Sequence, residues 1–398
     1  MGRARLTTVT VAIALLVGAT AVATRGQARP APTATWDVAA ERAERDADIA
    51  WYTMRAERDP SGAFDRLRLA GLYLQRARER GSPGDLLNAE REARTSLANR
   101  RAHNGEAFRA LALALIGQHR FVEAAEAADS LLAADPASAG ARSLRAEIAL
   151  EQGDYARADS LFAPLDRPGH DPAVTSRVAR WASLNGRADH ARRLLQQARD
   201  DARRTAFTPA EQVAWYDLRL GELALAAGRF REAARSLEAA AEVVPDDPRI
   251  LLAQARLALA RGDERQALAR AEEAMRHGED PIAFATAAEA LDRLGRTEES
   301  ARMFRAFEAT IAAAPREAWH RPWRIALLDR GTRVPEVLAQ AEAELRLRQD
   351  VHGYDVHAWA LHKAGRTAEA RRAMQQALRL GTEDRLLDAH AKAIGVSR

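Results

Sequence analysis

The 398-residue sequence contains no cysteine. This absence excludes disulfide bonds, thiol catalysis, zinc sites with cysteine ligands and a bacterial lipoprotein anchor. Aromatic residues make up only 5% of the chain although 47% is hydrophobic, so alanine and leucine supply most of the apolar surface. Lysine occurs only at Lys363 and Lys392, and arginine carries nearly all of the positive charge. This composition favours long helices that approach one another closely.

The usual catalytic and metal-binding motifs are also missing. No glycine-rich phosphate loop follows a strand, no serine occupies a nucleophile elbow, and the motif His-Glu-x-x-His is absent. His352, His357 and His362 are spaced by five residues, so their side chains do not share one face of a helix. We therefore expect no enzyme activity, no catalytic residue, no metal site and no cofactor.

The balance of charge argues against a nucleic-acid partner. The formal net charge is only +4, because arginine alternates with glutamate and aspartate in stretches such as "ERQALARAEEAMR". Such stretches form nearly neutral helix faces and give no basic stripe for a phosphate backbone. We expect no nucleic-acid binding, and an RNA-binding helical repeat is the less favoured alternative.

The first residues predict export. Residues 1–23 begin with Arg3 and Arg5, continue with an uncharged apolar stretch and end in small residues. This pattern is typical of a secretory signal peptide cleaved after Ala23, and an N-terminal membrane anchor is the alternative. Residues 24–35 predict a flexible linker. We expect a periplasmic protein. If the segment is uncleaved, we expect it to anchor the protein to the membrane, with the rest of the chain on the extracytoplasmic side.

The rest of the chain is repetitive. A glycine followed by helix-forming residues recurs at intervals of 33 to 42 residues, usually with a small residue five positions later and a bulky one nine positions later. The longest interval indicates an insertion around residues 200–212, interpreted as a longer second helix and a turn. The recurring glycines are Gly153, Gly186, Gly228, Gly262, Gly295, Gly331 and Gly365.

This spacing predicts a helical hairpin. A glycine with positive φ ends the first helix. Small residues let the second helix pack closely against it, and the bulky residue fills the space towards the next hairpin. Helical periodicity runs from about Trp36 to Ile394 without a convincing strand. The sequence therefore predicts an all-α protein built of stacked hairpins.

One copy carries a family resemblance. The stretch "LGELALAAGRFREAARSLEAAAEVVP", residues 220–245, matches the tetratricopeptide repeat at Leu220, Gly221, Gly228, Phe230, Ala233, Leu237, Ala240 and Pro245. The chain thus resembles a tetratricopeptide repeat (TPR) protein, and residues 352–384 resemble the last repeat of exported bacterial members. The resemblance implies an α-solenoid, a right-handed superhelix of antiparallel helix hairpins.

The same resemblance suggests a domain organisation. About eight hairpins are expected over residues 64–382, with degenerate copies at 64–101 and 317–349. Capping helices are expected within residues 36–63 and, with the tail, within residues 383–398, because terminal repeats must cover an exposed apolar face.

The resemblance also implies a partner-binding groove on the concave, first-helix side. The protein is then an extracytoplasmic scaffold that binds a peptide or protein partner. The alternative is a periplasmic accessory subunit that binds a small ligand or polysaccharide. Tryptophan in a helix array also packs more often than it recognises a partner. The groove positions carried over from the family are Trp215, Leu218, Glu222, Arg256, Glu289, Arg293, Asp355, Trp359 and His362.

Overall fold

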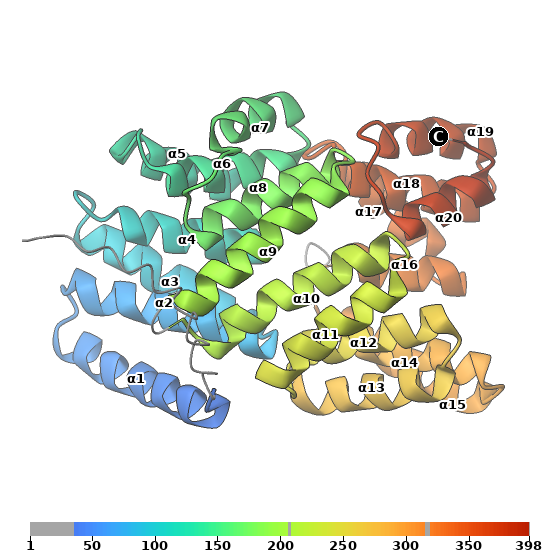
Figure 1. Ribbon diagram of the computed structural model, residues 1–398, viewed down its shortest axis with the longest axis horizontal. Coiled ribbons are helices and arrows are strands. Elements are labelled where there is room, and N and C mark those ends of the chain that lie inside the picture. Colours follow the sequence, from blue (N-terminus) through green and yellow to red (C-terminus); the bar gives the residue numbers. More distant parts are fainter. Residues whose placement is uncertain (1–35, 206–207, 315–318, 398) are drawn as a thin grey trace, which may run out of the picture. The chain divides into compact units, whose positions relative to one another are not determined.

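The computed structural model describes residues 36–205, 208–314 and 319–397, and within these ranges every regular element is a helix (Figure 1). The α-helices are α1 (Val38–Arg58), α2 (Ala63–Arg80), α3 (Pro83–Asn99), α4 (Gly105–Gly117), α5 (Phe121–Ala134), α6 (Ala139–Gln152), α7 (Tyr155–Phe162), α8 (Pro172–Leu184), α9 (Ala188–Arg204), α10 (Ala210–Ala226), α11 (Phe230–Val243), α12 (Pro248–Arg261), α13 (Glu264–His277), α14 (Ile282–Arg293), α15 (Thr297–Ala313), α16 (Arg321–Arg330), α17 (Val334–Glu344), α18 (Val351–Lys363), α19 (Thr367–Ala377) and α20 (Arg385–Ile394). A short 3-10 helix, η1 (Ala163–Leu165), follows α7.

The predicted signal or anchor segment, residues 1–23, and the linker, residues 24–35, lie outside the described residues. Among the helices that are described, none is both long and apolar enough to cross a membrane.

Consecutive helices form hairpins, and successive hairpins pack against one another (Figure 1). The described residues contain nine hairpins, from α2 with α3 to α18 with α19, flanked by α1 and α20. About eight hairpins are expected over residues 64–382, and the described residues form nine; the degenerate stretches contribute α2 with α3 and α16 with α17. The fold is an all-α, TPR-like solenoid, as the repeat pattern predicts.

The turn glycines have the conformation expected for them. All seven have a positive φ, between 68° and 77°, a region in which a side chain is strained. The turn between α4 and α5 has no glycine, and His119 takes the left-handed conformation there with a φ of 58°. The glycine pattern therefore identifies most hairpins and misses this turn.

Several first helices begin at an Asp-Pro pair. The side chain of Asp247 accepts the N–H of Arg249, while Pro248 occupies the first turn of α12, where its missing N–H costs nothing. Asp171 and Pro172 begin α8 in the same way. These pairs fix the point at which a new hairpin starts.

The helices of one hairpin approach closely through small residues. In the hairpin of α10 and α11, a Cβ atom at Gly221 would lie 2.7 Å from the side chain of Leu237 and 3.5 Å from the carbonyl oxygen of Ala233. Ala233 is fully buried. Glycine is therefore needed at position 221 because the bulky residue of the partner helix occupies the space of a side chain.

The insertion near residues 200–212 lengthens two helices. Both α9 and α10 have 17 residues, whereas α8 has 13 and α11 has 14. The longer second helix predicted from the sequence is α9, and the first helix that follows it is extended as well.

Two of the first helices, α6 and α10, are enclosed. No residue of α6 or α10, both fully described, is exposed. In contrast, α11 alternates buried positions such as Leu237 with exposed ones such as Arg235. Solvent therefore reaches the hairpin of α10 and α11 mainly through its second helix.

The last part of the chain packs against the turns of earlier hairpins. A Cβ at Gly153 would lie 2.4 Å from the carbonyl carbon of Gln349, and one at Gly186 would lie 2.8 Å from the oxygen of Gly381. The N–H of Gln349 also donates to the carbonyl of Gln152 at 3.0 Å. Residues nearly two hundred positions apart thus touch, and these turns need glycine both for φ and for space.

Candidate functional site

The predicted groove residues all lie on first helices, namely α10, α12, α14 and α18, but they differ in exposure. Arg256, Glu289 and Arg293 are exposed. Trp215, Glu222 and His362 are half-buried. Leu218, Asp355 and Trp359 are buried. The role of this set in partner binding stays a prediction.

Trp359 and His362 belong to one aromatic stack. The indole of Trp359 lies between His362, with ring centroids 5.1 Å apart, and His390 of α20, at 4.3 Å. Its Nε1–H donates to Asp329 at 2.8 Å. With 9% of its surface exposed, Trp359 packs α18 against the helix that ends the array.

Asp355 is the centre of a buried ion-pair network. It is completely buried, and it accepts hydrogen bonds from Arg321 and contacts the ring of His390 at 2.7 Å. Burial alone would raise the pKa of this carboxyl, but the guanidinium of Arg321 and the contact with His390 outweigh burial and lower the pKa to about 2. Asp355 is therefore ionised at neutral pH, and its charge is used to join α16, α18 and α20.

Two surface hollows lie on the other side of the hairpins, between successive second helices. One lies between α3, α4 and α5 and has a volume of about 380 Å³. We call it the apolar hollow, because Phe108, Leu111 and Leu115 of α4 form its floor, and Leu97 of α3 adds to its wall.

The rim of the apolar hollow carries charge of both signs. The guanidinium of Arg101 lies over the ring of Phe108, 5.2 Å from its centroid. Glu123 is paired with Arg94 and Arg120 at 3.0 and 2.6 Å. The carboxylate of Glu126 has no hydrogen bond or ion pair with any described residue, so it is free to meet a cation.

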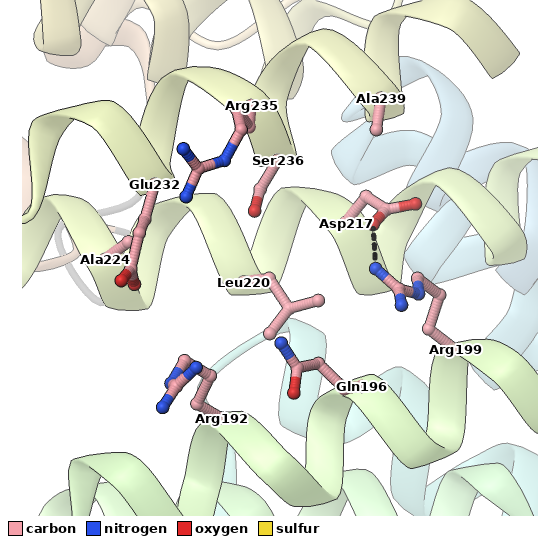
Figure 2. Close-up of a pocket in the computed structure, with 10 residues that line it drawn as sticks. All are labelled: Arg192, Gln196, Arg199, Asp217, Leu220, Ala224, Glu232, Arg235, Ser236 and Ala239. Atoms are coloured by element: carbon pink, nitrogen blue, oxygen red, sulfur yellow. Dashed lines mark hydrogen bonds and ion pairs between the residues drawn. The ribbon is translucent and has the colours of Figure 1, made fainter.

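The second hollow lies between α9, α10 and α11 and has a volume of about 240 Å³ (Figure 2). We call it the arginine hollow, because Arg192 and Arg199 of α9 and Arg235 of α11 line it. Its floor is Leu220 and Ala224 of α10. Asp217, also in the floor, is 1% exposed and is held by Arg199 and Arg203 at 3.2 and 2.8 Å.

The two hollows occupy equivalent positions in their hairpins. When the α4–α5 turn is aligned on the α10–α11 turn, every residue that α4 and α5 contribute to the first hollow falls on one that α10 and α11 contribute to the second. The equivalent pairs are Phe108 and Asp217, Leu111 and Leu220, Leu115 and Ala224, Glu123 and Glu232, Glu126 and Arg235, Ala127 and Ser236, and Ser130 and Ala239.

Sequence reasoning missed these hollows, because the carried-over family positions are those of the first-helix side. A signal was present: at the second-helix positions between the buried small residues, the copies differ in charge and size. Elsewhere, the described residues include no group of three or more histidine, aspartate or glutamate side chains that could hold a metal ion.

Two stretches of the chain match family models described as tetratricopeptide repeat. The first match covers residues 115–180, from the end of α4 into α8, and the second covers residues 218–281, from α10 through α13. The first match contains the His119 turn and the glycine turn at Gly153, and the second contains the glycine turns at Gly228 and Gly262. No curated protein matches the chain.

Solved structures are similar at low identity. The human IFIT1 dimer with m7Gppp-AAAA is 15% identical, over 80% of this chain and 72% of that chain, with a TM-score of 0.51. A tetratricopeptide repeat protein from Parabacteroides merdae is 15% identical over 65% and 99%, with a TM-score of 0.43. PilW, a type IV pilus biogenesis factor, is 15% identical over 54% and 97%, with a TM-score of 0.44. The first of these likenesses shows the fold alone.

The helical hairpins repeat along the chain with the same turn geometry and the same close packing at small residues. Family models match two separate stretches of this array. The chain is a tetratricopeptide repeat protein.

Proposed function

We propose that the protein is an exported scaffold that binds a segment of a protein partner in the apolar hollow. Tetratricopeptide repeats generally bind protein partners and are generally non-enzymatic, so a protein-interaction scaffold is the function that the family supports. We choose this surface because its floor, formed by Phe108, Leu111 and Leu115, is apolar and is open between two second helices.

The chemistry of the hollow describes the partner segment. An apolar side chain can enter a hollow of about 380 Å³ and remove the apolar floor from water. A basic residue beside it can pair with Glu126, whose carboxylate has no partner among the described residues. The segment is therefore amphipathic, with one or two apolar anchors and an adjacent arginine or lysine.

Filling the hollow tests this proposal. Ala98 is exposed on α3 and lines the hollow, so Ala98→Trp adds bulk there without removing a core contact. Ala389→Trp, at an exposed position of α20, is the matched control. Tagged chains of residues 24–398 would be incubated with membrane extracts, and captured proteins would be quantified by mass spectrometry.

We expect a defined set of proteins to be captured by the unchanged chain and by Ala389→Trp and to be lost, by about tenfold or more, with Ala98→Trp. Equal capture by the two tryptophan variants, with both folded by circular dichroism, would show that the apolar hollow is not the binding surface.

Export is supported by the basic start at Arg3 and Arg5 followed by the apolar stretch of residues 1–23. A fusion of residues 1–35 to a reporter enzyme that is active only outside the cytoplasm tests it. We expect an active reporter, and substitution of the apolar stretch by serine should abolish the activity. An inactive fusion would contradict export.

A further inference from the structure

We propose that the arginine hollow is a second binding site, which takes the carboxylate of an aspartate or glutamate side chain in a protein partner. This inference rests on the proposed scaffold function, and it concerns a different surface from the apolar hollow. Four polar side chains carry it: Arg192 and Gln196 of α9, and Arg235 and Ser236 of α11.

These side chains have unused hydrogen-bond donors. Arg235, Gln196 and Ser236 have no side-chain hydrogen bond or ion pair with any described residue. Arg192 makes one long contact of 3.5 Å, to the exposed Asp189, and its Nε is buried without a partner. Water can accept hydrogen bonds from most of these donors. A carboxylate, however, accepts hydrogen bonds from several of them at once, and these charge-assisted bonds are stronger than the neutral bonds to water.

The donors converge on one space. In Figure 2 the amide of Gln196 and the hydroxyl of Ser236 face each other across Leu220, while the guanidinium groups of Arg192 and Arg235 extend from opposite walls. A carboxylate placed above Leu220 would therefore meet neutral donors on both sides and positive charge from both helices. The geometry is that of a small polar site on an apolar floor.

The acidic residues of the hollow do not cancel this charge. Asp217 is balanced by two arginines, Arg199 and Arg203. Glu232 has one partner, Arg229, at 3.9 Å. The residues that line the hollow thus carry three guanidinium groups, those of Arg192, Arg199 and Arg235, against the carboxylates of Asp217 and Glu232, and the hollow keeps a net positive charge.

Size and surroundings select a single carboxylate. The volume of about 240 Å³, with Leu220 and Ala224 as floor, fits the short apolar stem and the head of an acidic side chain. A nucleic acid or other polyanion would bring further negative charge close to Glu232 and to the exposed Asp189 and Asp200, which would repel it.

The equivalent hollow differs at two of these positions. Glu126 stands where Arg235 stands, and Ala127 stands where Ser236 stands. The apolar hollow therefore lacks the donors of Arg235 and Ser236 and presents the free carboxylate of Glu126, although Arg94 and Arg101 also line it. One scaffold thus offers two sites at equivalent repeat positions, one for a basic segment and one for an acidic segment.

The test uses the purified chain of residues 24–398 and three fluorescent decapeptides followed by anisotropy at low salt. The first has a single central glutamate among alanine residues and is amidated at its end. The second has glutamine in place of glutamate and is amidated. The third has glutamine and a free terminal carboxylate, which separates the two sources of this group.

We expect only the glutamate peptide to bind, and we expect Arg235→Gln to weaken its binding about tenfold, as the loss of one charge-assisted hydrogen bond would. Arg235→Lys should recover part of the affinity. Arg231→Gln is the matched control, because Arg231 is exposed on the same helix outside the hollow.

Three results would overturn the proposal: no binding of the glutamate peptide, binding of the free-terminus peptide alone, or equal weakening by Arg235→Gln and Arg231→Gln. These measurements use no cellular partner. A failure here therefore leaves the capture experiment with Ala98→Trp unaffected, and a failure there leaves this one unaffected.

Discussion

The apolar hollow and the arginine hollow share a backbone frame and differ in chemistry. Asp217 stands where Phe108 stands in the floor, and Arg235 stands where Glu126 stands on the rim. The repeat pattern constrains the turn and the small residues between paired helices, because these set the distance between helices. Positions that face solvent between second helices are free of this constraint, so they can diverge and acquire binding functions.

Buried positions of the same two hairpins also differ, but in a compensated manner. Gly221 of α10 faces Leu237, whereas the equivalent pair in α4 and α5 is Ala112 and Ala128. A large side chain in one helix is matched by the absence of one in the other. Core positions thus change in pairs, while surface positions change singly.

The largest expected effect comes from removing the apolar floor. Phe108→Ala should lower the free energy of unfolding by about 3–5 kcal/mol, because it removes a buried ring and leaves a cavity. Asp217→Ala should cost less, about 2 kcal/mol, because Arg199 and Arg203 remain partly solvated after they lose their partner. Urea unfolding measures both changes.

Salt should affect the stability losses of the two floor substitutions differently. The loss for Asp217→Ala should shrink at 1 M NaCl because the ion pairs it removes are then screened, and the loss for Phe108→Ala should not shrink. Similar salt dependence for the two variants would contradict the difference drawn between the hollows.

The packing of Gly221 against Leu237 predicts that the effect of Gly221→Ala on stability changes sign when Leu237 is replaced by alanine. Gly221→Ala places a Cβ 2.7 Å from Leu237, so it should destabilise the protein by about 1 kcal/mol despite the better helix propensity of alanine. In a Leu237→Ala background the clash is absent, and the same substitution should stabilise by up to about 1 kcal/mol. The free energies of unfolding of the four proteins in this cycle measure the coupling.

Ala112→Gly is the control for that cycle. It should cost about 1 kcal/mol, since Ala128 leaves room for the methyl group and only helix propensity is lost. Additive effects of Gly221→Ala and Leu237→Ala would show that the two positions are not packed against each other as described.

The smallest effect concerns the rim of the apolar hollow. Glu126→Gln should weaken capture of the partner about threefold, because an exposed ion pair contributes less than about 1 kcal/mol. Quantitative capture at two salt concentrations measures it, and the effect should vanish at high salt. A loss as large as that of Ala98→Trp would mean that charge, and not the apolar floor, dominates binding.

The sequence predicted the fold through residues with a single possible role. Glycine at 153, 186, 228, 262, 295, 331 and 365 is strongly favoured where φ is positive, so each marks a turn without knowledge of its neighbours. His119 shows the limit of that signal, because a residue other than glycine occupies the same conformation at the turn between α4 and α5.

The surroundings of the candidate site residues could not be predicted in this way. Trp359 and Asp355 are on the expected helix, but their burial depends on His390 and Arg321, which reach them from α20 and α16. Such contacts between separate hairpins depend on how the array curves. The hollows could not be predicted for the same reason, because each of them is formed by three helices from two hairpins.

The contact of Gly153 with Gln349 and that of Gly186 with Gly381 limit how this array can evolve. In an open solenoid each unit touches only its neighbours, so one unit can be duplicated or deleted without disturbing the others. Here the loss or gain of one hairpin between these positions would move the distant backbone out of register with the turns that receive it. These contacts therefore constrain the number of repeats, and the array is left to diverge by substitution of side chains.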